Sequence, residues 1–166
     1  MIFVIVGSQK FQFNRLLKEI DRLIEENKIT EEIFAQIGYS DYKPKNYKYS
    51  NFLDRDEFSN IMSKCDKVIT HGGTGAIMGA LKQEKKVIVV PRLKRFGEHV
   101  DDHQIQIISE FKELDFIEAI YDINDLKNVI NKVENKKVKK YSSNTDIFIK
   151  DIEEFITSQK EKRWKR

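Results

Sequence analysis

Short, largely apolar runs alternate along this chain with segments of helical periodicity, and this alternation restricts the fold more than any other feature. Such runs, rich in β-branched residues and closed by glycine or proline, are typical of buried strands. Between them, apolar residues recur at the period of an amphipathic helix, as in Phe13–Ile24. Strands that alternate with helices predict an α/β fold, a Rossmann-like parallel sheet with helices on both faces. The expected strands are 2–6, 33–37, 68–70, 87–90 and 116–121, with 49–53 open, and the expected helices are 13–24, one capped by Asp54, 76–81, one capped by Asp101 or Asp102, and 126–133.

The 166 residues fit one domain, and 40% hydrophobic residues argue against a disordered chain. We assign residues 1–134 to the α/β domain. Residues 135–166 form a basic, lysine-rich link and a C-terminal helix at 146–159 with an apolar side. That helix either folds back on the domain or packs on a partner, and its basic flank suits an anionic membrane surface.

The overall charge is small: 30 Lys and Arg against 27 Asp and Glu give +3, which argues against a nucleic-acid binder. Cys65 is the only cysteine, so no intrachain disulfide can form, and we interpret it as a buried structural thiol. The start, Met1–Gly7, is too short for a signal peptide, and no stretch approaches the ~18 apolar residues of a membrane span. We expect a soluble cytoplasmic protein that reaches a membrane only through another protein.

Two glycine turns follow expected strands, Gly7-Ser8 after the first and Gly72-Gly73-Thr74-Gly75 after 68–70. The carboxyl ends of parallel strands are where α/β sheets bind ligands. Glycines let the backbone approach an anion, and the following helix points its free N–H groups and positive dipole end at it. A plain strand-to-helix turn rarely needs three glycines in four positions, so this loop predicts a phosphate site. It is neither a Walker loop nor a dinucleotide fingerprint.

A second polar cluster follows Pro91 and contains Glu98, His99, Asp102, His103 and Gln104. These side chains could in principle ligate a metal, but their spacing matches no zinc pattern and cysteine ligands are lacking. Hydrogen bonding to sugar hydroxyls suits Asp, His and Gln together better, so we expect no metal and no cofactor. For His71, just before the glycine loop, a structural and a functional role remain equally open.

Several motifs in order resemble the PssE-type polysaccharide glycosyltransferases, over residues 1 to about 120. The wider group is the C-terminal half of glycosyltransferase family 28, which includes the catalytic half of the eukaryotic dolichol-linked N-acetylglucosamine transferase and MurG-like enzymes. The motifs are Met1–Gln9 with Phe13–Leu17, Ala35–Ser40, the Thr70–Gly75 loop, and Gly97–Gln104.

The resemblance implies the C-terminal, donor-binding half of a two-domain GT-B enzyme divided between two chains. It implies inverting transfer of a sugar from a UDP-sugar to a lipid-linked saccharide in capsular or exopolysaccharide synthesis, without a metal. The partner would be a membrane-anchored PssD-like, acceptor-binding chain, which would hold this protein at the inner face of the cell membrane. By resemblance, Phe52 and Leu53 flank the uracil, Gly72–Gly75 hold the diphosphate, and Gly7 and Ser8 line the cleft. The residues that the resemblance places at the sugar are Glu98, Asp102, His103 and Gln104. His71 and His99 are candidates for the general base.

Gly79 departs from the pattern of the wider family, in which a glutamate on the helix after the glycine loop accepts hydrogen bonds from the ribose. A first alternative is therefore a non-catalytic enhancer subunit that keeps the fold. A second is a nucleotide hydrolase or sensor of the lysine-decarboxylase-like Rossmann type. Those proteins keep a glutamate soon after their glycine loop, and the Asp102–Gln104 segment has no role in them, so both features argue against this second alternative.

Overall fold

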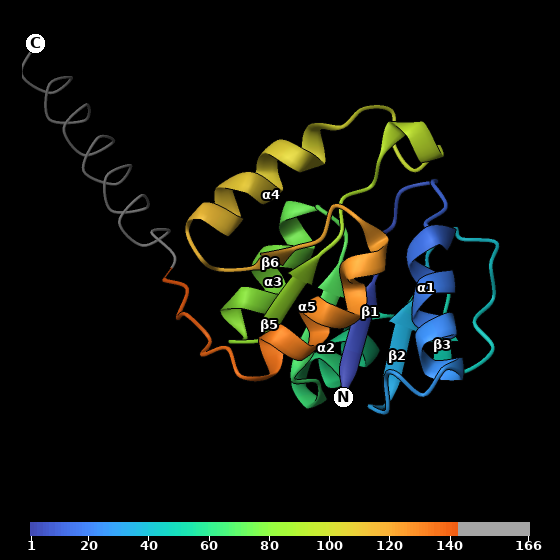
Figure 1. Ribbon diagram of the computed structural model, residues 1–166, viewed down its shortest axis with the longest axis horizontal. Helices are drawn as coiled ribbons and strands as arrows, with labels where there is room; N and C mark the ends of the chain where they lie inside the picture. Colours follow the sequence, from blue (N-terminus) through green and yellow to red (C-terminus); the bar gives the residue numbers. More distant parts are fainter. Residues whose placement is uncertain (143–166) are drawn as a thin grey trace, which may run out of the picture.

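The computed structural model describes residues 1–142, which form a twisted parallel sheet between two layers of helices (Figure 1). The sheet is six-stranded with the order β3-β2-β1-β4-β5-β6, and each of its five strand pairings is parallel. The strands are β1 (Ile2–Ile5), β2 (Ile33–Gln36), β3 (Lys48–Ser50), β4 (Lys67–Thr70), β5 (Lys86–Val89) and β6 (Glu118–Ala119). The helices are α1 (Asn14–Glu25), α2 (Arg55–Lys64), α3 (Thr74–Lys82), α4 (His103–Glu113) and α5 (Leu126–Glu134), with single 3-10 turns at Lys94–Phe96 and Ile123–Asp125.

The strand order reverses between β1 and β4, because the chain builds outward from β1 first in one direction and then in the other. In doubly wound sheets such a switch point opens a crevice beyond the carboxyl ends of the two central strands. Ile5 is level with Thr70 across that pairing, so the turns after β1 and β4 begin side by side. The sheet expected from the sequence is confirmed, and it places both glycine turns at the switch point.

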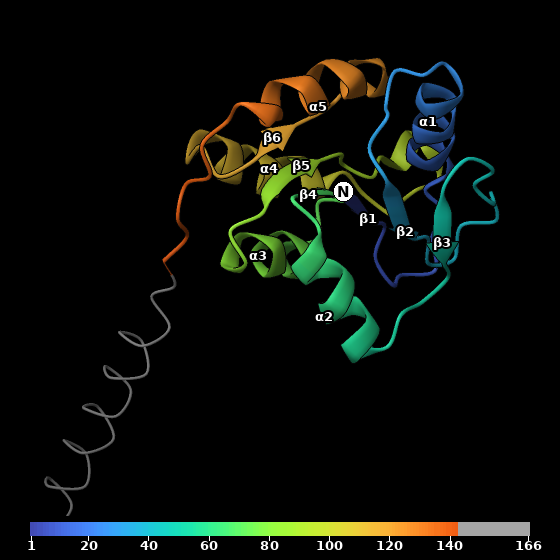
Figure 2. The same ribbon diagram turned by 90° about the horizontal axis from the view of Figure 1, so that it is seen from below.

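Two apolar clusters hold the helices to the sheet, one on each face. Figure 2 shows α1 and α5 on one side of the sheet and α2 and α3 on the other. Ile2 and Val4 of β1 face α1 and α5, whereas Phe3 and Ile5 face α2, α3 and α4. All four side chains are at most 3% exposed. Alternate residues of a strand point to opposite faces, so a strand covered by helices on both sides must be apolar throughout. The continuous apolar run at the start of the sequence has this origin.

The ends of α2 behave as the sequence predicts. Asp54 accepts hydrogen bonds from the N–H groups of Asp56 and Glu57, and the Glu57 carboxylate accepts the N–H of Asp54, which is a complete capping box. At the other end Cys65 is 1% exposed, donates its thiol hydrogen to Met62 O at 3.2 Å, and has its pKa raised by burial. The interpretation of Cys65 as a buried structural thiol is confirmed.

At the start of α4, one of the two predicted capping residues occupies the N-cap position and the other accepts a backbone N–H group. Asp102 occupies the N-cap position without a capping bond from its side chain, while the Asp101 carboxylate accepts the N–H of His103 at 3.2 Å. The strand left open at 49–53 is confirmed in part, since β3 ends at Ser50. Leu53 instead turns inward against the cluster beneath α2.

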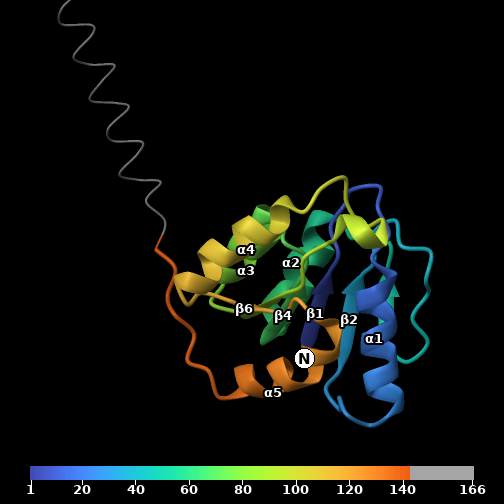
Figure 3. The ribbon, with the colours of Figure 1, turned by 45° about the horizontal axis from the view of Figure 1, so that its top comes forward.

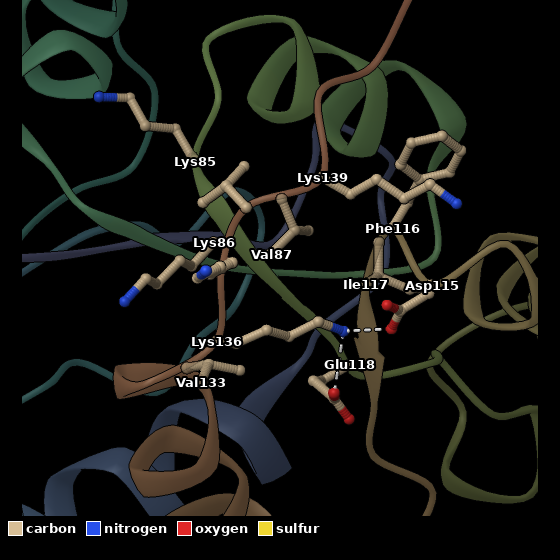
Figure 4. A pocket seen from close by; sticks show the side chains of 12 residues that line it. Lys85, Lys86, Val87, Asp115, Phe116, Ile117, Glu118, Val133, Lys136 and Lys139 are labelled. Atoms are coloured by element: carbon tan, nitrogen blue, oxygen red, sulfur yellow. Dashed lines mark hydrogen bonds and ion pairs between the residues drawn. The ribbon is translucent and has the colours of Figure 1, made fainter.

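The lysine-rich link continues past α5 and lies along the edge of the domain beside β6 (Figure 4). Lys136 pairs with Asp115 at 2.6 Å and with Glu118 at 3.1 Å, and Tyr141 packs edge-on against Phe116. A hollow of about 10 Å³, with Lys136, Asp115, Glu118 and Phe116 among its lining residues, has room for little more than a water molecule. The helix expected at 146–159 lies outside the described residues. Within residues 1–142, no helix has the length and apolar character needed to cross a membrane.

Candidate functional site

A cavity of about 440 Å³ lies beyond the carboxyl ends of β1 and β4, at the switch point. Figure 3 brings this edge forward, with the segment after β1, the start of α3 and the segment leading into α4 around it. The volume falls in the range of small-molecule sites. The cavity is lined by Ile5, Gly7, Ser8, Gln9, Gln36, Phe58, His71, Gly72, Gly73, Thr74, Gly75, Ala76, His99, His103, Gln104 and Ile107.

The glycine loop presents the start of α3 to this cavity. Gly73 is the N-cap of the helix and has no side chain to satisfy the first N–H groups. Those groups have no partner within a helix, and they carry the positive end of its dipole. Thr74 and Gly75 are exposed and line the cavity. The geometry therefore offers backbone donors, and the Thr74 hydroxyl, to an anion.

The side chain of His71 explains why positions 7 and 73 are occupied by glycine. A Cβ on Gly73 would meet His71 Cε1 at 2.8 Å, and one on Gly7 would meet the same atom at 2.7 Å. Gly7 also has φ +84°, a conformation that L side chains rarely adopt. The imidazole thus lies between the two turns, with Nδ1 3.4 Å from both Ile5 O and Thr70 Oγ1.

Burial, helped by the nearby positive charge of Arg92, lowers the pKa of His71 to about 4. The ring is therefore neutral near pH 7 and contributes a hydrogen-bonding group rather than a positive charge. A base with so low a pKa accepts a proton weakly at neutral pH. These observations favour the structural role of His71 and make it a poor candidate for the general base.

Gln104 ties the glycine loop to the end of β5. Its side-chain oxygen accepts the N–H groups of Gly72 and Arg92, both at 3.0 Å, and the residue is 4% exposed. The resemblance implied a sugar contact for this residue. Because the oxygen is occupied, only the amide nitrogen remains available for a ligand within the described part of the chain.

His99 and His103 both line the cavity, and their ring centroids lie 4.8 Å apart. The Asp101 carboxylate accepts from Nδ1 of both rings, at 3.1 Å for His99, and the hydrogen bond from His103 lowers the pKa of Asp101. His99 packs on Phe11 and is 7% exposed, and its Nε2 has no partner within residues 1–142. Ligand atoms of these three residues lie within 4.8 Å of one another. The group that could hold a metal is thus His99–Asp101–His103, not the set that includes Glu98 and Asp102.

Four of the expected site residues do not line the cavity. Glu98 is fully buried, and its carboxylate is held by Arg15 at 2.9 and 3.0 Å and by Leu93 N–H at 3.0 Å. These contacts give Glu98 a structural role, which differs from the expected sugar contact. Asp102 accepts the N–H of Lys94 at 2.8 Å.

Phe52 and Leu53, expected at the uracil, also lie outside the lining residues. Phe52 is 45% exposed and packs edge-on against Tyr39, with ring centroids 5.1 Å apart. The N–H of Leu53 donates to the side-chain oxygen of Gln36, which itself lines the cavity. Nucleoside binding by Phe52 and Leu53 stays a prediction.

Sequence reasoning missed Gln36 and Arg92. Gln36 is a polar residue in an otherwise apolar strand and is 9% exposed, and that interruption of the pattern was the available signal. Arg92 follows Pro91 directly and is 1% exposed. A single arginine after a strand is typical of a surface residue, so no local pattern in the sequence indicated that Arg92 is buried.

A doubly wound parallel sheet with a glycine loop and an uncapped helix start at its switch point defines a Rossmann-like α/β domain. The chain belongs to the glycosyltransferase family 28 C-terminal domain family, whose model matches residues 1–158. The predicted family is thereby confirmed, whereas the PssE-type assignment stays a prediction.

One relative is the UDP-N-acetylglucosamine transferase subunit ALG13 of Candida albicans (strain SC5314 / ATCC MYA-2876). It is 29% identical over 98 residues, which cover 59% of this chain and 30% of the relative. The chain therefore spans less than a third of that relative's length.

Solved structures share the fold. The glycotransferase of kitacinnamycin has a TM-score of 0.59 at 15% identity, with 81% of this chain and 35% of that chain covered. Acinetobacter baumannii MurG has a TM-score of 0.56 at 18% identity, covering 80% and 41%. ALG13 in solution has a TM-score of 0.56 at 19% identity, covering 86% and 89%. The expected fold, the C-terminal half of a GT-B glycosyltransferase, is confirmed.

Proposed function

We propose that this chain is the donor-binding subunit of a split, inverting glycosyltransferase. It holds a UDP-sugar while the sugar passes to a lipid-linked saccharide in capsular or exopolysaccharide synthesis. The observation that supports the proposal is the uncapped start of α3, whose donors face a cavity of about 440 Å³ at the switch point. Negative charge develops on the UDP leaving group, and fixed backbone donors and a helix dipole stabilise such charge without a metal.

Within this proposal, Gly72–Gly75 bind the diphosphate, Gly7 and Ser8 line the shared cleft, and Phe52 and Leu53 flank the uracil. His103, with the amide nitrogen of Gln104, contacts the sugar. His103 lines the cavity and is 47% exposed on its side chain, so it is open to a ligand.

The proposal includes a second chain, a membrane-anchored, PssD-like subunit that binds the acceptor. His71 is neutral at pH 7 with a pKa of about 4, which leaves His99 and a residue of the acceptor-binding partner as the candidates for the general base. That partner also keeps this chain, in the cytoplasm, at the inner face of the membrane. Deleting residues 146–166, whose sequence contains the apolar side described above, should abolish co-purification with the partner; unchanged co-purification would contradict this assignment.

The direct test is calorimetric titration of the isolated chain with UDP, UMP and ADP. A UDP site built on a diphosphate cradle should bind UDP more tightly than UMP, and UDP more tightly than ADP. Equal binding of UDP and ADP would remove the uridine assignment, and no binding of either would remove the donor-binding proposal. A screen of UDP-sugars with the co-expressed partner then identifies the sugar transferred.

A non-catalytic enhancer subunit is the second candidate, and Gly79 is the observation in its favour. A Cβ at Gly79 would meet nothing within 4 Å, so the fold leaves room there for the glutamate of the wider family. The variant Gly79→Glu tests this alternative. If the chain is an enhancer that has lost donor affinity, Gly79→Glu should strengthen UDP binding. Binding of UDP by the isolated wild-type chain would exclude the enhancer assignment.

A further inference from the structure

Arg92 is the largest of the fully buried side chains in the described part of the chain, with 1% exposure. It follows Pro91 just beyond β5 and lies outside the residues that line the cavity. Burial of a guanidinium is expensive unless hydrogen bonds and opposite charge compensate it. Its contacts and its charge balance therefore need an explanation.

The Arg92 side chain reaches across the end of β4 to the segment that follows β1. One terminal nitrogen donates to the carbonyl oxygens of Phe11, Gln12 and Glu98, each at 3.1 Å. The other donates to Val6 O. Three of these four acceptors belong to residues 6–12, so one side chain fixes both ends of the turn that contains Gly7 and Ser8.

Within residues 1–142, the Arg92 guanidinium donates no hydrogen bond to a carboxylate. Glu98 is the nearest acidic partner, but both of its carboxylate oxygens are bound by Arg15, and one of them also accepts the Leu93 N–H. Arg15 and Arg92 together carry two positive charges against the one negative charge of Glu98. Burial lowers the pKa of Arg92 to about 10, so the guanidinium stays protonated at neutral pH and one positive charge is left in excess.

This excess charge lies directly behind the cavity wall. Arg92 is close enough to His71 to depress its pKa, and the backbone N–H of Arg92 shares the Gln104 oxygen with the N–H of Gly72. The turn that its guanidinium fixes supplies Gly7, Ser8 and Gln9 to the lining. Arg92 therefore contacts or neighbours both glycine turns without reaching the cavity.

We propose that Arg92 is a positioning residue for the donor diphosphate, rigidly ordering the turn at residues 6–12 and placing an uncompensated positive charge behind the glycine loop. The inference deepens the proposed function and rests on it. Fixed charge in a low-dielectric wall attracts an anion without reorganising and without a direct contact. It should act on the phosphates of UDP and leave the neutral nucleoside unaffected.

The experiment compares UDP with uridine for the full chain and for Arg92→Met, which removes the charge and keeps an extended side chain. The control is Arg95→Met, which removes an exposed arginine of the same segment. We expect Arg92→Met to weaken UDP binding roughly tenfold or more and uridine binding less than about twofold. Arg95→Met should change neither. Equal weakening of UDP and uridine, or no change in either, would overturn the role of the charge.

Arg92→Lys keeps the inference testable if Arg92→Met does not fold. A lysine keeps the charge, and burial lowers its pKa. The ratio of UDP to uridine affinity should then stay near that of the wild type at pH 7 and fall as the pH rises towards 8.5. The wild-type ratio should stay constant over this range, because a guanidinium with a pKa of about 10 remains protonated there. If the ratio of UDP to uridine affinity in Arg92→Lys does not depend on pH, the proposed role of the charge is wrong.

Hydrogen exchange at residues 6–12 decides the ordering role whether or not a ligand binds. Exchange should be faster in Arg92→Met than in the wild type and Arg95→Met, and equal exchange would overturn that role. If the wild-type chain binds neither UDP nor inorganic pyrophosphate, both the proposed function and the charge role fail. If it binds them and Arg92→Met binds them equally well, only the inference on Arg92 fails.

Discussion

The fit of His71 between two glycines can be tested by adding a single methyl group. Gly73 has φ −76° and ψ 120°, which alanine adopts without strain, so the backbone does not oppose Gly73→Ala. The new Cβ would instead lie 2.8 Å from His71 Cε1 and 3.0 Å from Cδ2, and Nε2 would be closer still. The ring must move, and it is confined on its other side by Gly7.

The expected cost follows from this crowding. Forcing an extra methyl group into a packed site typically costs about 1–3 kcal/mol. For a chain of this size each kcal/mol lowers the melting temperature by about 2–4 °C. Displacement of His71 also shifts the loop that presents the α3 donors, so UDP binding should weaken by roughly tenfold or more. The larger Gly73→Val should abolish UDP binding.

Two matched glycines on the same helix separate crowding from other effects. A Cβ at Gly75 or at Gly79 would meet nothing within 4 Å. Gly79→Ala should therefore stabilise the protein by up to about 1 kcal/mol through helix propensity alone and leave UDP binding unchanged. Gly75→Ala should also fold normally, but it should weaken UDP binding because Gly75 lines the cavity.

The assay is urea unfolding of the wild type and the four glycine variants, with UDP calorimetry on each protein. The ring signals of the three histidines are followed in NMR spectra. The His71 signals should shift in Gly73→Ala and stay in place in Gly79→Ala. A Gly73→Ala variant that matches the wild type in stability, His71 signals and UDP affinity would refute the packing argument.

Three further predictions concern neighbouring groups. The folded-state pKa of His71, about 4, lies below its ordinary value of 6.5, so the unfolded chain takes up the proton first as the pH falls. The free energy of unfolding should drop between pH 6.5 and 4, and the contribution of His71 to this drop should reach about 2 kcal/mol at pH 5. That contribution should be missing in His71→Gln. Identical pH profiles of the two proteins in urea unfolding would contradict this prediction. Gln104→Leu leaves the buried N–H groups of Gly72 and Arg92 without a hydrogen-bond acceptor. It should lower the free energy of unfolding by about 1–3 kcal/mol for each group. The control Gln106→Leu, on the exposed side of α4, should be near neutral in the same assay. Asp54→Ala removes the capping box of α2 and should lower stability by about 1 kcal/mol, which thermal unfolding against Asp56→Ala as control would detect; equal melting temperatures would exclude the cap as a stabilising feature.

The sequence by itself determined the elements and their order. Strand β1 is apolar at every position because helices cover both of its faces, and that requirement is visible in Ile2–Ile5 without coordinates. Asp54 marks the start of α2 because an N-cap aspartate accepts N–H groups of the residues that follow it directly in the chain. The glycine loop was likewise readable, since a strand, a turn and a helix start are contiguous in the chain. Each of these signals lies within one short stretch of the chain.

Only the tertiary structure decided which side chains build the wall of the site. Glu98 was expected at the sugar, but it meets Arg15, which lies 83 positions away in the chain. Arg92 reaches Val6 over a separation of 86, and His71 determines that Gly7 and Gly73 carry no side chain. Such contacts exist because the sheet order brings the ends of β1, β4 and β5 together. A single sequence gives the residue types at these positions, but not which of them meet, because pairing over such separations depends on the packing of the whole domain.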